Sequence, residues 1–297
     1  MHSEVLSLEA IRGYEKAGNI LKSIRATLPR KIRHGSGLLD LVEYVEGETI
    51  RLGAMPAFPC NISINDVASH YTPSRDDRRT FEHGDVVKID LGVCYDGYIA
   101  DSAFTFEIDT EDHRRLIQAA ERALEESIAV IKPGIYVSEI GRAISKAAAE
   151  DGYEVLRRLL GHSLSRHCLH GGLTIPAFDD GRKMKIREGD VLAIEPFLTT
   201  GKDDITERRK GNIYQLLRDD PIYAPDERGA RLLKYISEKY DRFPFAERWL
   251  PDHPGLQELM RSAAIKSFPM LVTADGGVVA QAEHTVIVEK NGCRKIT

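Results

Sequence analysis

Two short stretches of this sequence repeat one pattern, and each places an acidic residue in an otherwise apolar strand. Residues 84–91 (GDVVKIDL) align with residues 189–196 (GDVLAIEP), so Asp90 and Glu195 occupy equivalent places. In both stretches a Gly-Asp turn precedes the apolar run. A carboxylate in a buried strand is costly unless something neutralises its charge. The repetition therefore indicates two related half-domains that face one shared site, and a bound cation is the simplest occupant of that site.

A second acid follows Asp90 in a predicted β-hairpin. The dipeptide Asp96-Gly97 is typical of a two-residue turn. A hairpin with this turn places Asp90 and Asp101 on the same face, with their Cα atoms about 7–8 Å apart. Two carboxylates that converge there repel each other unless a cation or a shared proton lies between them. From these two residues alone, a pair of solvated strand acids is the alternative interpretation.

Other residues with catalytic chemistry are dispersed along the sequence. His70, His162 and His170 each lie in a short polar motif, and Glu283 precedes the final apolar strand. Taken singly, each has an ordinary explanation, because a lone histidine is usually a satisfied polar side chain and a strand-end glutamate is usually solvated. The repeat described above favours a common site.

The elements that carry these residues recur in the same order. Helical periodicity covers residues 6–27 and 112–131. Each of these helices is followed by a second, one running from an N-cap at Ser36 to about Glu46 and one over residues 137–150. Each helix pair precedes its own Gly-Asp unit. The sequence therefore predicts a pseudo-symmetric α+β domain.

The second half contains a segment without a counterpart in the first. Residues 217–267 are again helical in pattern, with helices predicted over residues 228–240 and 255–266 and prolines between them. We interpret this segment as a helical insertion within a single domain that spans residues 1–297.

The composition restricts the class of protein further. The chain has 297 residues, 42% of them apolar and 29% charged, with a net charge of −5. This length allows a large core, and the charge gives no general attraction to nucleic acid or membrane. No apolar run approaches the roughly 18 residues of a membrane span, and the scattered cysteines indicate reduced thiols. We expect a cytoplasmic protein with no membrane partner and no specific nucleic-acid partner.

At its chemically active residues the sequence resembles the methionine aminopeptidases. The motifs that match are residues 57–59 (AFP), 69–73 (SHYTP), 88–92 (KIDLG), 99–103 (IADSA), 161–164 (GHSL), 169–172 (LHGG), 193–197 (AIEPF) and 283–285 (EHT). They keep the order and spacing of that family over essentially the whole chain. The insertion resembles that of type II members, and residues 244–249 (PFAERW) resemble the archaeal branch. The resemblance implies the pita-bread fold of the creatinases and aminopeptidases.

Carried over position by position, the resemblance implies a dinuclear metal site. Asp90 would bind one ion through both oxygens, and Asp101 and Glu283 would bridge the two ions. His162 and Glu195 would complete the shell of the other ion. Four carboxylates and one imidazole suit several divalent ions, so Co, Mn, Fe(II) and Zn are all candidates.

The resemblance also implies the reaction, which is removal of the N-terminal methionine from nascent proteins and peptides whose second residue is small. A hydroxide held between the ions would attack the peptide bond, and Glu195 would pass its proton to the leaving nitrogen. His170 would stabilise the oxyanion, and His70 would hold the scissile amide. Phe58 and Phe268 would line the pocket for the methionine side chain. Such an enzyme is expected to be a monomer, and transient ribosome contact would fit its nascent substrates.

Three positions depart from the family pattern. Phe268 replaces a common tyrosine, His167 stands where type II members usually carry tyrosine, and Ala282 stands where many carry phenylalanine. These departures bear on the shape of the pocket and on metal preference, and they leave the five ligand positions intact.

Two alternative functions share this sequence pattern. Proline-directed aminopeptidases and dipeptidases have the same ligands but usually an extra N-terminal domain, for which a first helix near residue 6 leaves no room. A non-catalytic binding relative would use basic segments such as residues 25–34 and 208–210 as docking surfaces. Relatives of that kind lose metal ligands, whereas this sequence keeps all five.

Overall fold

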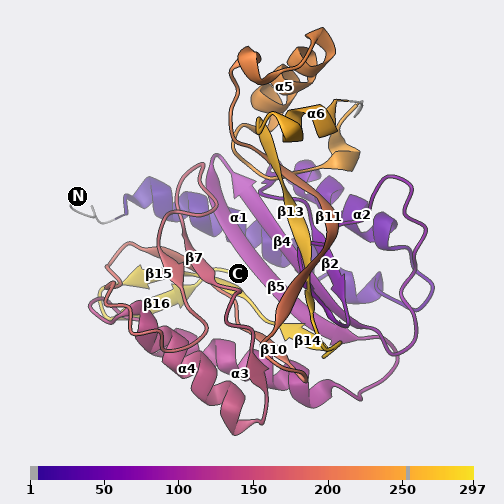
Figure 1. Cartoon of the computed structure of the whole chain (residues 1–297). Coiled ribbons are helices and arrows are strands. Elements are labelled where there is room, and N and C mark those ends of the chain that lie inside the picture. The colour runs from indigo at the N-terminus through magenta and orange to yellow at the C-terminus, as the bar shows by residue number, and fades with distance from the viewer. Residues whose placement is uncertain (1–5, 252–254) are drawn as a thin grey trace.

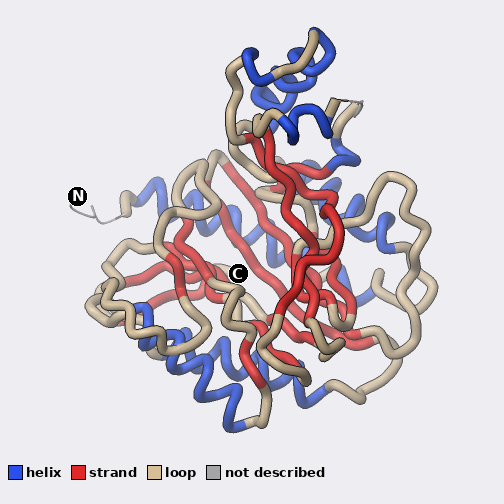
Figure 2. The backbone as a smooth tube through the Cα atoms, in the orientation of Figure 1, coloured by secondary structure: helices blue, strands red, loops and turns tan. Residues whose placement is uncertain are grey.

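Each half of the molecule places a pair of helices against a sheet, in the computed structural model that describes residues 6–251 and 255–297 (Figures 1 and 2). The first half consists of α1 (Leu8–Arg25), a short 3₁₀ turn η1 (Leu28–Arg30), α2 (Leu38–Arg51), β1 (Met55–Pro56), β2 (Asn61–Ile64), β3 (Val67–Ser69), β4 (Val86–Tyr95) and β5 (Tyr98–Glu107). The second half begins with α3 (Arg114–Ala129), α4 (Val137–Glu150), β6 (Glu154–Val155), β7 (Gly161–Leu164), β8 (Thr174–Ile175), β9 (Val191–Ile194) and β10 (Phe197–Thr199). It continues after the insertion with β14 (Val279–Gln281), β15 (His284–Glu289) and β16 (Gly292–Lys295).

The long strand β4 organises the first half, and β9 has the corresponding place in the second. β4 pairs antiparallel with β1, β2 and β5, while β9 lies between β7 and β15 in a sheet of order β16-β15-β9-β7-β8. Residues 108–113, between β5 and α3, link the two halves. No helix within the described ranges is long and apolar enough to cross a membrane.

The two Gly-Asp units adopt the same local structure. Gly84 and Gly189 have positive φ angles of 84° and 87°, a conformation that glycine adopts without steric cost. Each following aspartate accepts a hydrogen bond from the backbone N–H three residues before it, at 2.8 Å for Asp85 and 2.7 Å for Asp190. The internal repeat that the sequence predicts is therefore present in the structure as two matching turns that begin β4 and β9.

The predicted hairpin also forms as expected. Asp96 and Gly97 connect β4 to β5 with φ angles of 49° and 81°, as the two-residue turn requires. Asp90 lies opposite Ala103, and Asp101 lies opposite Gly92.

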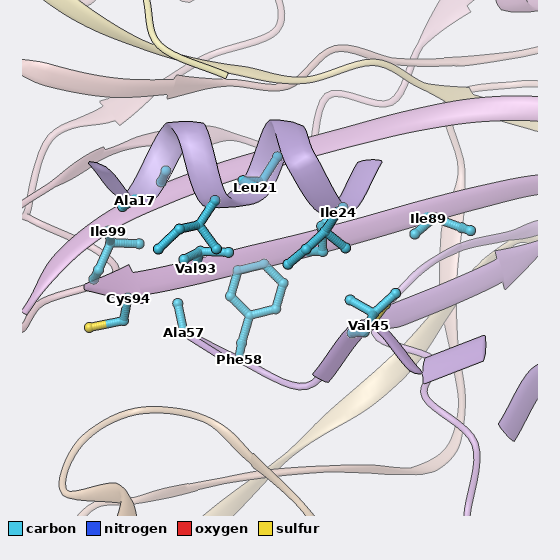
Figure 3. Close-up of a cluster of buried hydrophobic side chains, with 14 of the residues drawn as sticks. Ala17, Leu21, Ile24, Val45, Ala57, Phe58, Ile89, Val93, Cys94 and Ile99 are labelled. Atoms are coloured by element: carbon cyan, nitrogen blue, oxygen red, sulfur yellow. The ribbon is translucent and has the colours of Figure 1, made fainter. Parts of the chain in front are cut away.

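The core of the first half lies between α1 and the β4–β5 hairpin. Figure 3 shows Leu21 and Ile24 of α1 in one buried cluster with Val93 of β4. Each such side chain removed from water contributes about 1.5–3 kcal/mol. Leu8, in contrast, is 74% exposed, so the apolar face of α1 begins later than the sequence pattern indicates. α2 packs into the same core as α1. The second half is built on the same plan, with α3 and α4 covering β9, β10, β14 and β15.

The start and end of α2 differ from the prediction. Its N-cap is Gly37 rather than Ser36, because the Ser36 hydroxyl instead donates to the carbonyl of Arg33 and accepts from the N–H of the same residue. The helix also continues to Arg51, one turn beyond the predicted end.

The inserted segment forms a small separate body next to the main sheets (Figure 1). Between β11 (Ile205–Leu216) and β13 (Ile265–Thr273) the chain forms η2 (Pro221–Tyr223), α5 (Glu227–Tyr240), β12 (Phe245–Ala246), η3 (Glu247–Trp249) and α6 (Leu256–Arg261). The segment has its own buried cluster. The predicted helix over residues 255–266 ends early, because Ala263 takes a positive φ of 56° and Ile265 pairs with Leu216 in the sheet. The limits of the insertion, residues 217–267, stay a prediction.

Candidate functional site

One cavity between the two halves is lined by every residue that the sequence assigns to the site. Its walls contain the five predicted metal ligands, the two predicted substrate histidines and both predicted pocket phenylalanines, namely Asp90, Asp101, His162, Glu195, Glu283, His70, His170, Phe58 and Phe268. Asp90 and Asp101 come from the hairpin of the first half. The other three predicted ligands come from the second-half sheet, on β7, directly after β9 and directly before β15.

His162 has one ring nitrogen directed at two carboxylates. Its Nε2 lies 3.8 Å from Oδ2 of Asp101 and 3.7 Å from Oε1 of Glu195. Its Nδ1 lies 3.4 Å from the carbonyl oxygen of Ser163, which can accept the ring proton in the tautomer that carries it on Nδ1. Burial lowers the pKa of His162 to about 3, so the ring is neutral. In that tautomer the lone pair of Nε2 faces the two carboxylates.

The four acids are buried together, which disfavours their ionised forms. Burial raises the pKa of Asp90 to about 7. Burial, and then the negative charge of neighbouring acids, raises the pKa of Asp101, Glu195 and Glu283 well above the usual range. The protein thereby concentrates acids that would ionise if a cation were present.

The donor set fits divalent metal ions. Asp101, His162 and Glu283 offer ligand atoms that all lie within 4.8 Å of one another. Asp90 Oδ1, Asp101 Oδ1 and Glu283 Oε2 are buried and have no hydrogen-bond partner among the described residues. Buried carboxylate oxygens are normally paired or bind metal. Carboxylates with one imidazole are donors typical of catalytic Mn, Fe(II), Co and Zn sites.

Hydrogen bonds between β5 and residues 283–285 fix the backbone around two of these acids, Asp101 and Glu283. The Ser102 hydroxyl donates to the Glu283 carbonyl at 2.8 Å, and the Glu283 N–H donates to the Ala103 carbonyl at 2.9 Å. The Thr285 hydroxyl accepts from the Asp101 N–H and donates to the Asp101 carbonyl, both at 2.8 Å. The backbone positions of Asp101 and Glu283 are therefore fixed relative to each other across the two halves.

Two further histidines lie beside the acids. The ring of His170 is 4.5 Å from that of His162, measured between ring centroids. His70 has a positive φ of 65° and places Nδ1 at 3.3 Å from the Pro269 carbonyl oxygen. Burial lowers the pKa of His70 to about 4, and burial and Lys266 lower the pKa of His170. Both rings are accordingly neutral at pH 7.

An apolar wall completes the cavity. Phe58 lies so close to the backbone of Gly92 that a Cβ there would come within 2.3 Å of the ring, and Phe268 packs edge-on against His70 at 5.3 Å. Sequence reasoning missed five lining residues, Asn61, Ser69, Leu169, Ile213 and Pro244. Asn61 could have been found, because it follows the AFP motif and pairs with Asp90 in the sheet. The departures His167 and Ala282 are not among the described lining residues.

Comparisons with known proteins show the family and the fold to which this chain is similar. Residues 12–290 match the profile of Metallopeptidase family M24. A methionine aminopeptidase of Thermococcus onnurineus (strain NA1) is 43% identical over 285 residues, which cover 93% of this chain and 96% of that protein. A crystal structure of methionine aminopeptidase from Thermotoga maritima superposes with a TM-score of 0.74 at 23% identity, over 99% of this chain and 98% of that chain. A thermophilic Arx1 structure gives a TM-score of 0.83 at 18% identity, over 98% and 91%.

The chain belongs to metallopeptidase family M24. The predicted α+β pita-bread fold is confirmed by the two structural likenesses, and the predicted resemblance to type II methionine aminopeptidases is confirmed by sequence identity over most of the chain.

Proposed function

We propose that this chain is a methionine aminopeptidase that removes the N-terminal methionine from nascent proteins and peptides with a small second residue. The observation that carries the proposal is the convergence of His162 Nε2 on carboxylate oxygens of Asp101 and Glu195, at 3.8 Å and 3.7 Å. An imidazole and carboxylates that converge at these distances are a donor set that a divalent cation would hold together. The identity of 43% to a protein of this name supports the choice of reaction.

We propose that the site holds two divalent metal ions. Asp90, Asp101, His162, Glu195 and Glu283 would hold them. When bound, the ions would supply a nucleophilic water at neutral pH and polarise the scissile carbonyl. Co, Mn, Fe(II) and Zn all suit these ligands, and availability decides among such ions.

Glu195 would act as the general base. Glu195 lines the cavity with Oε1 at 3.7 Å from His162 Nε2, so it is placed beside any water that ions bound at these residues would hold. Its carboxylate would accept a proton from the attacking water and release it to the leaving amine.

The two neutral histidines, His70 and His170, would form hydrogen bonds with the substrate's scissile amide and its carbonyl oxygen. His70 donates through Nδ1 to the Pro269 carbonyl, which leaves its Nε2 as an acceptor for the N–H of the scissile amide. His170 carries one ring N–H and would donate it to the developing oxyanion, a contribution of about 3 kcal/mol to transition-state stabilisation.

The apolar wall would select the side chain of the first residue. Phe58, Phe268, Leu169, Ile213 and Pro244 surround the cavity beside the acids. Methionine is unbranched and its sulfur makes favourable contacts with aromatic rings, so it suits a pocket with two phenylalanines. We further propose that the enzyme works in the cytoplasm as a monomer, with transient contact to the ribosome from which its substrates emerge.

The proposal is tested by hydrolysis of Met-Ala-Ser, Met-His-Ser and Ala-Pro-Ser by metal-free protein reconstituted in turn with Mn, Fe(II), Co and Zn. Metal-dependent release of methionine from Met-Ala-Ser alone is the expected result. Cleavage of Ala-Pro-Ser would instead assign the chain to the proline-directed branch. Bound metal without any cleavage would identify a non-catalytic relative.

A further inference from the structure

Arg248, in the inserted segment, lies in a buried junction outside the cavity. Its guanidinium pairs with Glu46 of α2, and only 3% and 9% of the two side chains are exposed. Arg248 Nη1 also donates to the Thr72 hydroxyl at 2.8 Å and to the Pro73 carbonyl at 3.0 Å. Burying a guanidinium is costly unless its charge is paired, and both Nη atoms of Arg248 are paired here, while Nε has no hydrogen-bond partner among the described residues. These contacts therefore hold the insertion against the first half.

Glu46 gathers hydrogen bonds from the same region. Its Oε2 accepts from the indole N–H of Trp249 at 2.7 Å, and its Oε1 accepts from the backbone N–H of Cys60 at 3.1 Å. The Thr72 hydroxyl, which accepts from Arg248, in turn donates to the Cys60 carbonyl at 2.7 Å. Three chain segments that are distant in sequence therefore meet at one ion pair.

The stretches around Cys60, Thr72 and Arg248 each carry part of the cavity wall, whereas no described residue of α2 lines it. Phe58 and Asn61 flank Cys60, His70 lies two residues before Thr72, and Pro244 lies four residues before Arg248. The predicted metal ligands lie on β4, β5, β7 and the ends of β9 and β15, and neither Glu46 nor Arg248 hydrogen-bonds to any of them in the described contacts. The junction thus supports the side of the cavity that would contact substrate. The four acids are instead held in place by the strands that carry or adjoin them.

We propose that the Glu46–Arg248 ion pair is a positioning device that sets the shape of the pocket for the substrate's first side chain, and with it the selectivity for methionine. The inference rests on the proposed function. Neither residue lines the cavity, so the pair acts through Phe58, His70 and Pro244. Its loss would let these walls move relative to one another while metal binding is kept.

The test compares wild type with Arg248→Met and Arg248→Lys. Metal content and thermal unfolding are measured first, and then kcat and KM for Met-Ala-Ser and Leu-Ala-Ser with the same metal. Since an apolar pocket discriminates by about 10–200-fold per methylene group, we expect Arg248→Met to raise KM for Met-Ala-Ser about tenfold and to lower the Met-to-Leu ratio of kcat/KM about tenfold. Metal content and kcat should change much less. Arg248→Lys keeps the charge but lacks the forked donors of a guanidinium. Its KM and its Met-to-Leu ratio should therefore lie between those of wild type and Arg248→Met.

Arg242→Met is the matched control. Arg242 also belongs to the insertion, where its side chain donates to the Leu217 carbonyl at 2.5 Å and lies 3.5 Å from Asp219. In the described contacts the Arg242 side chain forms no hydrogen bond or ion pair with Glu46, Cys60 or Thr72. Its replacement should leave both KM and selectivity as in wild type.

The outcomes separate this inference from the proposed function. A folded, metal-loaded Arg248→Met variant with wild-type selectivity would overturn the positioning role, as would an equal loss in the Arg242→Met control. If Arg248→Met does not fold, Arg248→Lys and Glu46→Gln provide the same comparison. If wild type itself releases no methionine, the proposed function fails and this inference fails with it.

Discussion

Nε2 of His162 and Oδ2 of Asp101 lie 3.8 Å apart across the boundary between the two halves of the fold. The first atom belongs to β7 and the second to β5. At this distance the two atoms form no hydrogen bond. Each belongs to a group that divalent cations bind, an imidazole and a carboxylate. A cation between them would bind both halves at once, so metal binding should be linked directly to the stability of the whole domain.

Replacing His162 should therefore remove metal and stability together. In His162→Ala we expect metal affinity to fall by more than about 100-fold, since even partners that only orient a ligand are worth 10–100-fold. Methionine release should be lost with it. The measurement is metal content after dialysis, with the thermal unfolding midpoint recorded with and without added Mn.

His167→Ala is the control for that change. His167 is exposed and five residues further along the same segment, so its loss should leave metal content unchanged. If His162→Ala retained both ions, the assignment of ligands would be wrong.

His170 should affect turnover and not metal loading. In His170→Ala we expect kcat to fall by about 10²–10³-fold, because one donor to the oxyanion is lost, while the metal content stays at the wild-type level. His170→Gln retains an N–H donor and should recover part of the rate. Steady-state kinetics with metal analysis on the same samples decides this, and equal loss of metal in His170→Ala would show that the residue is instead a ligand.

The parts of the fold that the sequence predicts well are those set by local chemistry. The Asp96-Gly97 turn determines the register of the hairpin, and this register alone brings Asp90 and Asp101 to one face. The repeated Gly-Asp turns identify the two halves because each depends only on a glycine with positive φ and a hydrogen bond three residues back.

Long-range packing accounts for what the sequence could not predict. Ile213 and Pro244 line the cavity only because β11 and the insertion fold over the first half. Pro244 begins the motif at residues 244–249, but that motif does not by itself indicate a place in the cavity. Ile265 was predicted to be helical, but its pairing with Leu216 places it in a strand. Likewise, no periodicity indicates that Arg248 would reach Glu46 on α2.

Thr285 should influence the site without contacting metal. Its hydroxyl makes two hydrogen bonds of 2.8 Å to the backbone of Asp101, and valine has the same shape but cannot form them. In Thr285→Val we expect a loss of about 1–3 kcal/mol in the free energy of unfolding, because the Asp101 groups stay buried without a partner. Metal affinity should fall about tenfold as the Asp101 carboxylate loses its fixed position.

Thr49→Val provides the comparison for Thr285→Val. Thr49 is also buried, but its hydroxyl donates to the Val45 carbonyl within α2 at 2.8 Å, remote from the cavity. It should lower stability without changing metal affinity. Urea unfolding and a Mn titration of both variants would show whether the two effects separate, and parallel losses of affinity would contradict the prediction.

The free energy of unfolding of the metal-free protein should depend on pH through the ionisation of Asp90. Burial raises the pKa of this carboxyl from 3.8 to about 7. A group whose folded-state pKa is raised contributes its stability fully below the unfolded pKa and loses it as pH rises through the folded value. Metal-free wild type should therefore lose stability relative to Asp90→Asn between about pH 4 and pH 7, by up to about 4 kcal/mol.

The measurement is urea unfolding of both metal-free proteins at pH 4, 5.5 and 8. Asp90→Asn should equal wild type at pH 4 and exceed it at pH 8, because asparagine needs no proton to remain neutral in the cavity. Adding Mn at pH 8 should reverse the order, since the ion stabilises the ionised carboxylates of wild type in proportion to its occupancy. A difference between the two proteins that did not change with pH would show that Asp90 is ionised in the folded chain even without metal, and that its neighbours already satisfy its charge.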